Sequence, residues 1–422
     1  MGKHILVVSQ YFYPEQFRIN DICIEWIKRG YKVTVLTGIP NYPYGKFYKG
    51  YGLLKKHKET YCGINIIRIP IFPRGNNPIM LILNYVSFVL SGFIWKTVTN
   101  IKADIVFIFE VSPMSQALPG IWFAKRRKIP CYIYVQDLWP ENVEIIAGIK
   151  NKYLIGAIGK MVDYIYSRCT RILTTSISFV MSINKRGVPI EKIEYWPQYA
   201  EDFYKPIENV TIDEIPLDGA FNITFAGNIG YAQGLNILPK VAVMLKEMKV
   251  DRKIRFNIIG DGRYKNELIE LVNKNNVADM FNFISKQPST RIPEFLAASN
   301  AAFLSLADNP IFSMTIPAKL QSYMACGIAI IAAADGETNR IINESKSGKC
   351  SQAGNVKKLV DNIIELSTIS DIEIKQLGKN SREYYDKHFN KQQLLNKIDE
   401  LFNIDVPISI SPILEAKHYV QE

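Results

Sequence analysis

The sequence predicts an α/β protein with two Rossmann-like domains, each built on a doubly wound parallel sheet. The chain has 422 residues, 48% of them hydrophobic, which is too much for one ordinary core. Short, β-branched, nearly continuous apolar segments alternate with helical segments in both halves, as in buried parallel sheets. A polar stretch with Pro206 and Pro216 separates the halves. We therefore expect domains at 1–200 and 219–385 facing each other across a cleft, a linker at 201–218, and a C-terminal helix and tail at 386–422 packing back towards the first domain.

The first half opens on a strand at 4–9, because HILVVS is an apolar run. The same pattern predicts strands at 32–37, 64–70, 104–109, 131–135 and 171–175, and helices near 15–29, 79–95 and 153–167. In the second half it predicts strands at 221–225, 253–259, 281–284, 301–306 and 328–334. The helices expected there lie near 318–326, 372–388 and 391–402, with one more starting near Gln233.

The stretch FSMTIPAKLQSYMACGIAIIAAADGE, Phe312 to Glu337, holds the most informative candidate site. Pro317 suits the first turn of a helix, which then stops at Gly327. Four free backbone N–H groups near 315–319 and the helix dipole attract an anion, and Lys319 adds a full positive charge. The stretch therefore predicts a phosphorylated ligand at this helix start. The candidate binding residues are Thr315, Ile316, Lys319, Gln321 and Ser322.

Three further loops follow strands of the second half. AGNIG comes after the strand at 221–225, and its glycines let the backbone approach a phosphate closely; a tight turn that binds nothing is the alternative. GDGR, which follows the next strand, ends in a guanidinium that can contact phosphate oxygens. The third loop, at 285–287, follows the strand at 281–284. Since the carboxyl ends of parallel strands share one sheet edge, we expect these loops to converge on one ligand. Their candidate residues are Gly227, Asn228, Gly230, Arg263, Ser285 and Lys286.

Acidic residues follow two strands of the first half. QDLWPE places Asp137 and Glu141 after the strand at 131–135, where a carboxylate can accept a proton from a hydroxyl. The alternative is that Asp137 caps the following turn and Glu141 caps the start of a helix. Glu110, at the end of the preceding strand, is a rival with the same alternative. Arg18, on the first helix, suits an anionic acceptor or a surface ion pair.

Several classes of function are disfavoured. The glycine spacing is not GxGxxG, which disfavours a nicotinamide dehydrogenase. The formal charge of +11 is spread along the chain, so a phosphorylated substrate or phospholipid surface fits better than nucleic acid. With no DxD and four scattered histidines, we expect neither a metal nor a cofactor. Six cysteines without CxxC spacing, and a start with no signal-peptide pattern, indicate a cytoplasmic protein.

The longest apolar run, IMLILNYVSFVLSGFIW at 79–95, has three interpretations. It can be a core helix, a helix docked on a membrane surface, or a membrane span. Its 17 or so residues are near the lower limit for a span.

Motifs along nearly the whole chain resemble glycosyltransferase family 4 of the GT-B fold. They are YFYPEQFRIND, VTVLTGIPNYPYGKFYKGY, QDLWPE, AGNIG, GDGR and IPAKLQSYMACG with DGE. TIPAKLQSYMACG and LTGIPNYPYGKFYKGY are most similar to N-acetyl-L-fucosamine transferases of O-antigen and capsule synthesis.

This resemblance implies a retaining, metal-independent, hexosyltransferase-type transfer from a nucleotide sugar. The C-terminal domain would bind the donor and the N-terminal domain the acceptor. Gly227, Asn228 and Gly230 would border the diphosphate, while Arg263 and Lys319 would neutralise it. The loop with Ser285 and Lys286 would face the base. Asp137 would stand near the reacting hydroxyl.

Three departures from the family pattern stand out. Met314 and Ser322 occupy the positions of the family's two glutamates. Asn228 and Gln233 replace an Arg/Lys pair, and the histidine often found in the first domain is missing.

From all this we expect transfer of a deoxyamino sugar from UDP to a polyprenyl-diphosphate-linked saccharide, in lipopolysaccharide O-antigen or capsule biosynthesis. The enzyme would be peripheral at the inner face of the cytoplasmic membrane. The alternatives are a non-catalytic UDP-sugar-binding protein and a GT-B sugar-nucleotide epimerase.

Overall fold

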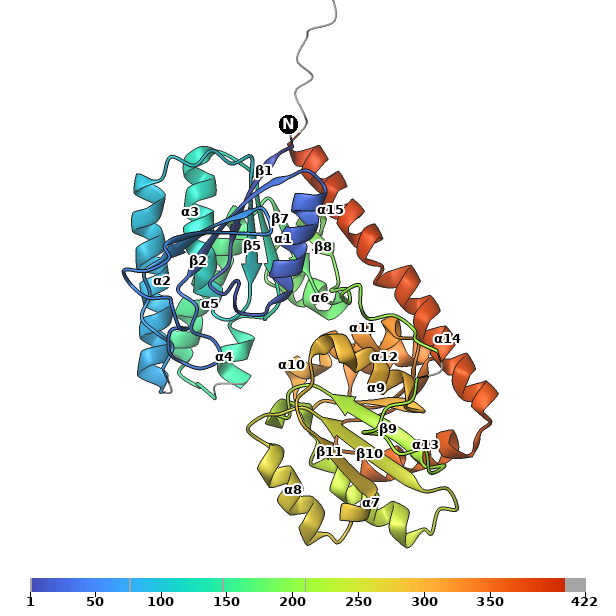
Figure 1. The fold of residues 1–422 in the computed structure, drawn as a ribbon. Helices are drawn as coiled ribbons and strands as arrows, with labels where there is room; N and C mark the ends of the chain where they lie inside the picture. Colours follow the sequence, from blue (N-terminus) through green and yellow to red (C-terminus); the bar gives the residue numbers. More distant parts are fainter. Residues whose placement is uncertain (1, 76, 146–147, 209, 407–422) are drawn as a thin grey trace, which may run out of the picture. The chain divides into compact units, whose positions relative to one another are not determined.

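The computed structural model describes residues 2–75, 77–145, 148–208 and 210–406. The chain divides into two compact units. The first consists of residues 1–134, 163–172 and 392–422, and the second of residues 135–162 and 173–391. Two sheets form the frame, one of eight strands and one of six (Figure 1). The fold-class prediction of two parallel-sheet α/β domains is confirmed.

The eight-stranded sheet has the order β3-β4-β2-β1-β5-β6-β7-β8. Its strands are β1 (His4–Val8), β2 (Lys32–Gly38), β3 (Lys58–Tyr61), β4 (Ile64–Ile69), β5 (Ile105–Glu110), β6 (Cys131–Val135), β7 (Arg171–Thr174) and β8 (Ile193–Tyr195). β6 and β7 straddle the division between the units. β3 pairs with β4 in antiparallel fashion, an exception to the predicted parallel order.

The helices that accompany this sheet include α2, the longest at 21 residues. They are α1 (Arg18–Lys28), α2 (Pro78–Val98), α3 (Leu118–Arg127), α4 (Glu141–Ile145), α5 (Lys152–Arg168), α6 (Ile177–Lys185) and α15 (Lys391–Asp405), with short 3₁₀ turns η1 (Met114–Ala117) and η2 (Ile190–Lys192).

Helix α15 is held by residues of the first unit. Arg29 forms an ion pair with Asp399 at 2.5 Å, and Lys3 donates to the Phe402 carbonyl at 2.8 Å. The Phe402 ring lies 5.8 Å from that of Trp26. The first unit is therefore built from both ends of the described chain, while residues 407–422 of the expected C-terminal tail lie outside the described residues.

The six-stranded sheet is parallel throughout, in the order β11-β10-β9-β12-β13-β14. Its strands are β9 (Phe221–Ala226), β10 (Ile254–Ile259), β11 (Phe281–Ile284), β12 (Ala301–Ser305), β13 (Ala329–Ala333) and β14 (Gly348–Ser351). Its helices are α7 (Ile237–Glu247), α8 (Lys265–Lys274), α9 (Ile292–Ala297), α10 (Pro310–Ser313), α11 (Ala318–Ala325), α12 (Gly336–Ser345), α13 (Val356–Thr368) and α14 (Asp371–His388).

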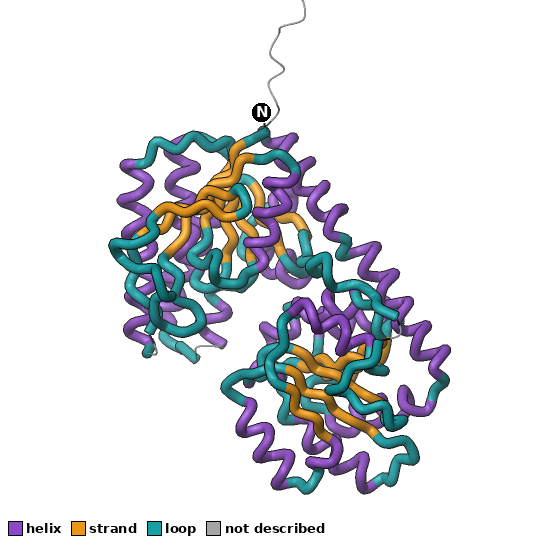
Figure 2. Tube along the Cα trace, viewed as in Figure 1, coloured by secondary structure: helices purple, strands orange, loops and turns teal. Residues whose placement is uncertain are grey.

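Both faces of the six-stranded sheet are covered, which explains its continuous apolar strands. Along β13, Ile331 joins one hydrophobic cluster with residues of α7 and α13. Its neighbour Ile330 joins a second cluster with residues of α9, α11 and α14. Figure 2 shows these strands lying between helices. The sheet is thus a rigid base, and its loops at the carboxyl edge are set by the strands that precede them.

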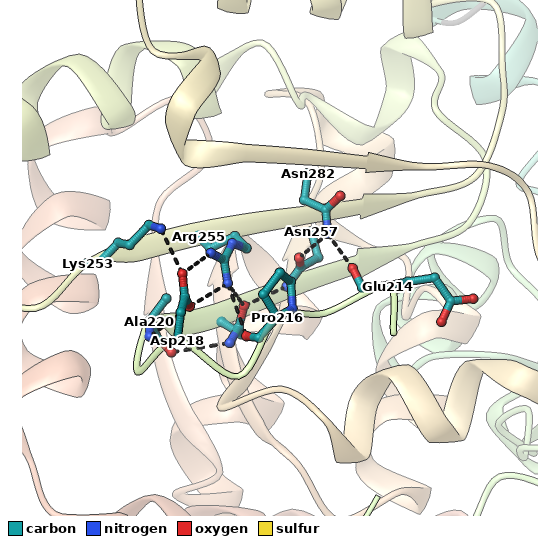
Figure 3. Close-up of polar contacts among 9 residues, drawn as sticks. Glu214, Pro216, Asp218, Ala220, Lys253, Arg255, Asn257 and Asn282 are labelled. Atoms are coloured by element: carbon teal, nitrogen blue, oxygen red, sulfur yellow. Dashed lines mark hydrogen bonds and ion pairs between the residues drawn. The ribbon is translucent and has the colours of Figure 1, made fainter. Parts of the chain in front are cut away.

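The end of the expected linker is fixed to the opposite edge of the same sheet. Asp218 accepts from Arg255 at 2.5 Å and from Lys253 at 2.8 Å (Figure 3). These two cations, Arg255 first, hold the pKa of Asp218 well below its usual range. Asn282 donates to the Glu214 carbonyl at 2.7 Å. Residues just before β9 are therefore anchored at the amino ends of β10 and β11, away from the glycine loops.

Candidate nucleotide-sugar site

Lys319, in the first turn of α11, carries a buried ammonium group. Its Nζ has no hydrogen-bond partner among the described residues and lies 3.7 Å from the centroid of the Phe225 ring. Burial lowers the pKa of Lys319 to about 7. A cation in this position is stabilised by the ring face but lacks a counter-charge. The arrangement suits an anionic ligand that supplies the missing charge.

The side chain of Lys319 reaches the loop that follows β9. Gly227 has φ +138°, and a Cβ there would lie 2.5 Å from Lys319 Cε. Tyr323, one turn further along α11, accepts from the Ala226 N–H at 3.1 Å. Helix α11 is therefore seated across the carboxyl end of β9.

The loops after β9 and β10 contact each other backbone to backbone. A Cβ at Gly260 would lie 1.9 Å from the Gly227 carbonyl oxygen, and one at Gly262 would lie 2.2 Å from that of Ile229. The Ile229 N–H also donates to the Asp261 carbonyl at 2.8 Å. These close approaches explain the glycines at 260 and 262.

The expectation that N–H groups of these loops are free requires correction. The Gly227 N–H donates to the Ile259 carbonyl at 2.9 Å, and the Gly230 N–H donates to Gln233 Oε1 at 3.2 Å. The Thr315 N–H donates to the Phe312 carbonyl at 3.2 Å. Pro317 is the N-cap of α11, not its first helical residue. The glycines at 227, 260 and 262 thus serve close packing, and the N–H groups of Gly227, Gly230 and Thr315 are not among the free donors expected here.

The polar candidate residues at 315–322 divide into two kinds. Thr315 Oγ1 donates to the Ile311 carbonyl at 2.9 Å, and Ser322 Oγ donates to the Ala318 carbonyl at 3.1 Å. Gln321 is buried, and neither of its polar side-chain atoms has a partner among the described residues. Ile316 is buried and apolar. Gln321 is therefore the side chain here, besides Lys319, with unmet hydrogen-bonding capacity.

Arg263, Asn228, Ser285 and Lys286 are exposed. They lie in the loops that follow β10, β9 and β11, which are neighbours in the sheet, so the structure brings these loops to one carboxyl edge. Lys265 was missed by the sequence reasoning: its Nζ donates to the Gly260 carbonyl at 3.1 Å. The sequence could not indicate this contact, because the contact depends on the turn at Gly260.

Glu337 does not replace the carboxylates that are missing at Met314 and Ser322. Its Oε1 accepts from the Ser178 N–H and hydroxyl, each at 2.7 Å, and its Oε2 accepts from Arg340 at 2.6 Å. It is 3% exposed. This carboxylate is therefore committed to holding α12 within the second unit.

The candidate acidic residues of QDLWPE also lie in the second unit. Asp137 is half-buried in the loop after β6, and Glu141 is the first residue of α4. A carboxylate in the first turn of a helix is favoured by the helix dipole, so the capping alternative for Glu141 stands beside the acceptor-binding prediction.

Two candidates belong to the first unit. Glu110 is fully buried at the end of β5, and Arg18 is the first residue of α1. Glu15 was missed as a candidate although it lies in the FYPEQFRIND motif. It is buried and accepts the N–H groups of Asn41 at 2.7 Å and Tyr42 at 2.6 Å, and burial raises its pKa to about 7. Glu15 therefore holds the loop after β1 against the loop after β2.

Over residues 2–75, 77–145, 148–208 and 210–406, no three histidine, cysteine, aspartate or glutamate side chains form a group suited to a metal ion.

The part of the chain that contains this site is similar to a known protein family. Residues 212–384, which include the loops after β9, β10 and β11 and helix α11, match the family described as glycosyl transferases group 1. These residues are similar to the group 1 glycosyl transferases. Lys319 and the loop glycines of the six-stranded sheet all lie inside the matched segment.

Solved structures with the same architecture cover nearly the whole chain. Sucrose-phosphate synthase of Thermosynechococcus elongatus aligns with a TM-score of 0.73 at 14% identity, over 95% of this chain and 98% of that one. Anabaena HepE in complex with UDP and glucose aligns with a TM-score of 0.67 at 13% identity, over 95% and 100%. The fold is GT-B.

One protein with a similar sequence is a D-inositol 3-phosphate glycosyltransferase of Pseudarthrobacter chlorophenolicus. It is 29% identical over 132 residues, which are 31% of this chain and 30% of the relative. The chain thus matches about a third of that relative's length.

Proposed function

We propose that the protein is a retaining glycosyltransferase that takes a deoxyamino sugar from a UDP-sugar. The observation that carries the proposal is the buried Lys319 ammonium, which has no partner among the described residues and lies within the segment that is similar to group 1 glycosyl transferases. The complexes of Anabaena HepE with UDP and UDP-glucose support a UDP-linked donor. The domain therefore suits a diphosphate that requires a counter-charge.

Leaving-group stabilisation is the main catalytic effect in this proposal. Breaking the bond between sugar and phosphate leaves negative charge on UDP, and a preorganised cation in a site of low dielectric stabilises that charge as it forms. Lys319 is preorganised by the Phe225 ring, and Arg263 adds a second cation from the loop after β10. The departing phosphate takes the acceptor proton, with Asp137 orienting the hydroxyl and Glu110 as the rival residue.

The donor sugar is proposed from the residues that replace the family's glutamates. Met314 offers no hydrogen bond to a sugar hydroxyl, and the Ser322 hydroxyl is already bonded within α11. A deoxy sugar has fewer hydroxyls to satisfy, so the substitution suits a 6-deoxyamino sugar such as N-acetyl-L-fucosamine.

The acceptor is proposed to be a polyprenyl-diphosphate-linked saccharide of O-antigen or capsule synthesis, with Arg18 and Glu141 as its candidate contacts. Such a lipid is held in a bilayer, so the enzyme would act as a peripheral protein at the inner face of the cytoplasmic membrane.

A second candidate is a non-catalytic UDP-sugar-binding protein, favoured by the missing carboxylates at 314 and 322. A GT-B sugar-nucleotide epimerase is a third, and it would release a changed sugar without an acceptor. Incubation of the protein with a panel of UDP-sugars, with and without a lipid-linked acceptor, separates the three. UDP release and a product of retained anomeric configuration only with acceptor support the transferase. Binding without turnover, or a changed UDP-sugar without acceptor, contradicts it.

A further inference from the structure

Helix α2 presents its apolar side chains outward. The buried residues of the helix are Asn84, Phe88 and Gly92, whereas Ile79 is 71% exposed and Val98 is 70% exposed. The exposed apolar residues recur every three or four positions and form one stripe along the whole helix. This α2 stripe consists of Ile79, Ile82, Leu83, Val86, Leu90, Phe93, Ile94 and Val98. A helix of a water-facing surface has the reverse pattern, with polar residues outside.

The inner face of α2 is fixed to the first unit by specific contacts. Asn84 donates to the Phe72 carbonyl at 2.6 Å and accepts from Gln10 at 2.7 Å. Ser91 donates to the Pro70 carbonyl at 2.6 Å. A Cβ at Gly92 would lie 2.3 Å from Pro119, so α2 and α3 pack closely, side by side in Figure 1. The polar groups that would otherwise oppose burial in lipid are thus satisfied on the protein side.

A basic cluster lies at the C-terminal end of the α2 stripe. Arg126 donates to the Lys96 carbonyl at 2.6 Å, and Arg127 donates to the Thr99 carbonyl at 3.0 Å, which bring the end of α3 beside the end of α2. Neither helix contains an aspartate or glutamate. The basic cluster consists of Lys96, Lys125, Arg126, Arg127 and Lys128.

Aromatic rings join the stripe to the basic cluster. The Phe93 and Trp122 rings meet edge to face at 5.5 Å, and Lys96 Nζ lies 4.4 Å from the Phe93 centroid. Tryptophan and cationic side chains are the residues that gather at the level of lipid headgroups. The aromatic rings and cations thus lie beside one end of the apolar stripe, where they can reach lipid headgroups.

We propose that the α2 stripe and the basic cluster form a docking surface for an anionic phospholipid bilayer, with α2 lying in the plane of the interface. A helix that lies in the interface binds through its buried apolar area and through attraction between neighbouring cations and anionic lipids. Electrostatics favours lipid over a second copy of the chain, because two copies of the basic cluster would repel each other. The binding does not depend on sugar transfer; only its purpose, reaching a lipid-linked acceptor, rests on the proposed function.

A membrane span is the competing arrangement. Within the described residues α2 is the one helix long and apolar enough to cross a bilayer, and 22% of its most apolar stretch is buried. At about 1.5 Å per residue its 21 residues reach about 31 Å, the thickness of the hydrocarbon core. A spanning helix would have to give up the Asn84, Ser91 and Gly92 contacts, which the interfacial arrangement keeps.

The test is flotation of the full chain with vesicles of phosphatidylcholine alone and of phosphatidylcholine with about a third phosphatidylglycerol, a typical anionic fraction. The stripe variant is Ile82→Gln/Val86→Gln/Leu90→Gln. Its matched control is Leu217→Gln/Met248→Gln/Ile372→Gln, three exposed apolar residues of the second unit. The charge variant is Lys125→Glu/Lys128→Glu, matched by Lys240→Glu/Lys357→Glu, which are exposed on α7 and α13.

The wild type and both controls should float with the anionic vesicles. The stripe variant should lose at least tenfold in partitioning. The charge variant should lose at least fivefold per lysine reversed, since a cation contributes about 1 kcal/mol near such a surface and each glutamate adds repulsion. A wild type that stays at the bottom, or a stripe variant that floats equally well, overturns the proposal. So does a stable wild-type dimer that the stripe variant converts to a monomer, or resistance of the cellular protein to alkaline carbonate extraction. UDP binding is measured separately on the same variants, so loss of docking and failure of the proposed function are distinguishable.

Discussion

The side chain of Lys319 fills the space that a β-carbon at Gly227 would need. A Cβ at Gly227 would lie 2.5 Å from Lys319 Cε and 2.9 Å from its Nζ, and real β-carbons do not approach so closely. The absence of a side chain at position 227 is therefore what lets the lysine lie over Phe225. The glycine loop and the lysine of α11 act as one site, although 92 positions separate them in the sequence.

Removal of the ammonium should separate activity from stability. Lys319→Ala should lose about 10²-fold in turnover, because it removes a preorganised cation that stabilises the leaving group. Lys319→Met keeps the aliphatic chain over Phe225 and should lose as much activity. Both variants should melt at the wild-type temperature or above, because a buried charge without a partner is costly.

The matched control is Lys240→Ala, an exposed lysine of α7. It should leave UDP release and melting temperature unchanged. Full turnover by Lys319→Met would contradict the role of the ammonium group.

Gly227→Ala should disable the site through Lys319. The strained φ alone costs about 1–3 kcal/mol, and the methyl group displaces the lysine. When Lys319 is already replaced by alanine, the methyl group at position 227 has no lysine to displace. Gly227→Ala should then lower the free energy of unfolding by less than it does in the wild type. Urea unfolding of the wild type, the two single variants and the double variant gives the coupling energy between the residues. It is expected at about 0.5–3 kcal/mol for residues in contact. A coupling near zero would mean that the two residues do not meet.

The pH dependence of UDP binding should report Lys319. Its pKa in the free protein is lowered to about 7 by burial, and the charge of a bound diphosphate should raise it. UDP affinity should therefore fall as pH rises above 7, and binding at pH 8 should take up close to one proton. Calorimetry at pH 8 in buffers of different ionisation enthalpy measures that uptake. An uptake no larger than the titration of UDP itself accounts for would contradict the assignment to Lys319.

The lowered pKa of Lys319 also makes the stability of the folded protein depend on pH. Because the lysine pKa is lower in the folded state than its unfolded value near 10.4, the unfolded chain binds more protons between pH 7 and 10. This group should therefore make the free protein more stable as pH rises through that window. If Lys319→Met and wild type show the same pH dependence of unfolding, the assigned burial is wrong.

Asp137→Asn should slow transfer without weakening UDP binding, because its proposed partner is the acceptor hydroxyl. Loss of an orienting carboxylate should cost about 10²-fold in turnover. Glu141→Gln and Glu110→Gln are the comparisons. An unchanged rate in Asp137→Asn together with a large loss in Glu110→Gln would transfer the role to Glu110.

Strands with two buried faces could be predicted from the sequence almost residue by residue. The segment at 131–135 matches β6, and the segment at 301–306 exceeds β12 by one residue, because continuous apolar runs leave little choice of boundary. β3 was missed because its sequence, KETY, is polar. The strand lies at the edge of the sheet and pairs with β4 in antiparallel fashion. The helix expected near Gln233 begins only at Ile237, because a short 3₁₀ turn ends at Gly234 with φ +59°.

The sheet edge at which the candidate loops meet could be predicted, but the contacts among their residues could not. Parallel strand order placed the loops after β9, β10 and β11 at one edge, as expected. Periodicity could not reveal that Lys319 lies over Phe225, or that the Gly227 N–H is already bonded, because both depend on how α11 packs against β9. The role of Glu15 was hidden for the same reason: its partners Asn41 and Tyr42 are far away in sequence.

The most direct test of the central claim is the thermal shift of wild type and Lys319→Met with UDP, GDP and ADP, each with EDTA present. A ligand at 100 times its dissociation constant stabilises by about 2.7 kcal/mol, which is easily measured. We predict a shift of the wild type with UDP alone, undiminished by the chelator and lost in Lys319→Met. No shift with any nucleotide, or an equal shift in the variant, would contradict a UDP site built around this lysine.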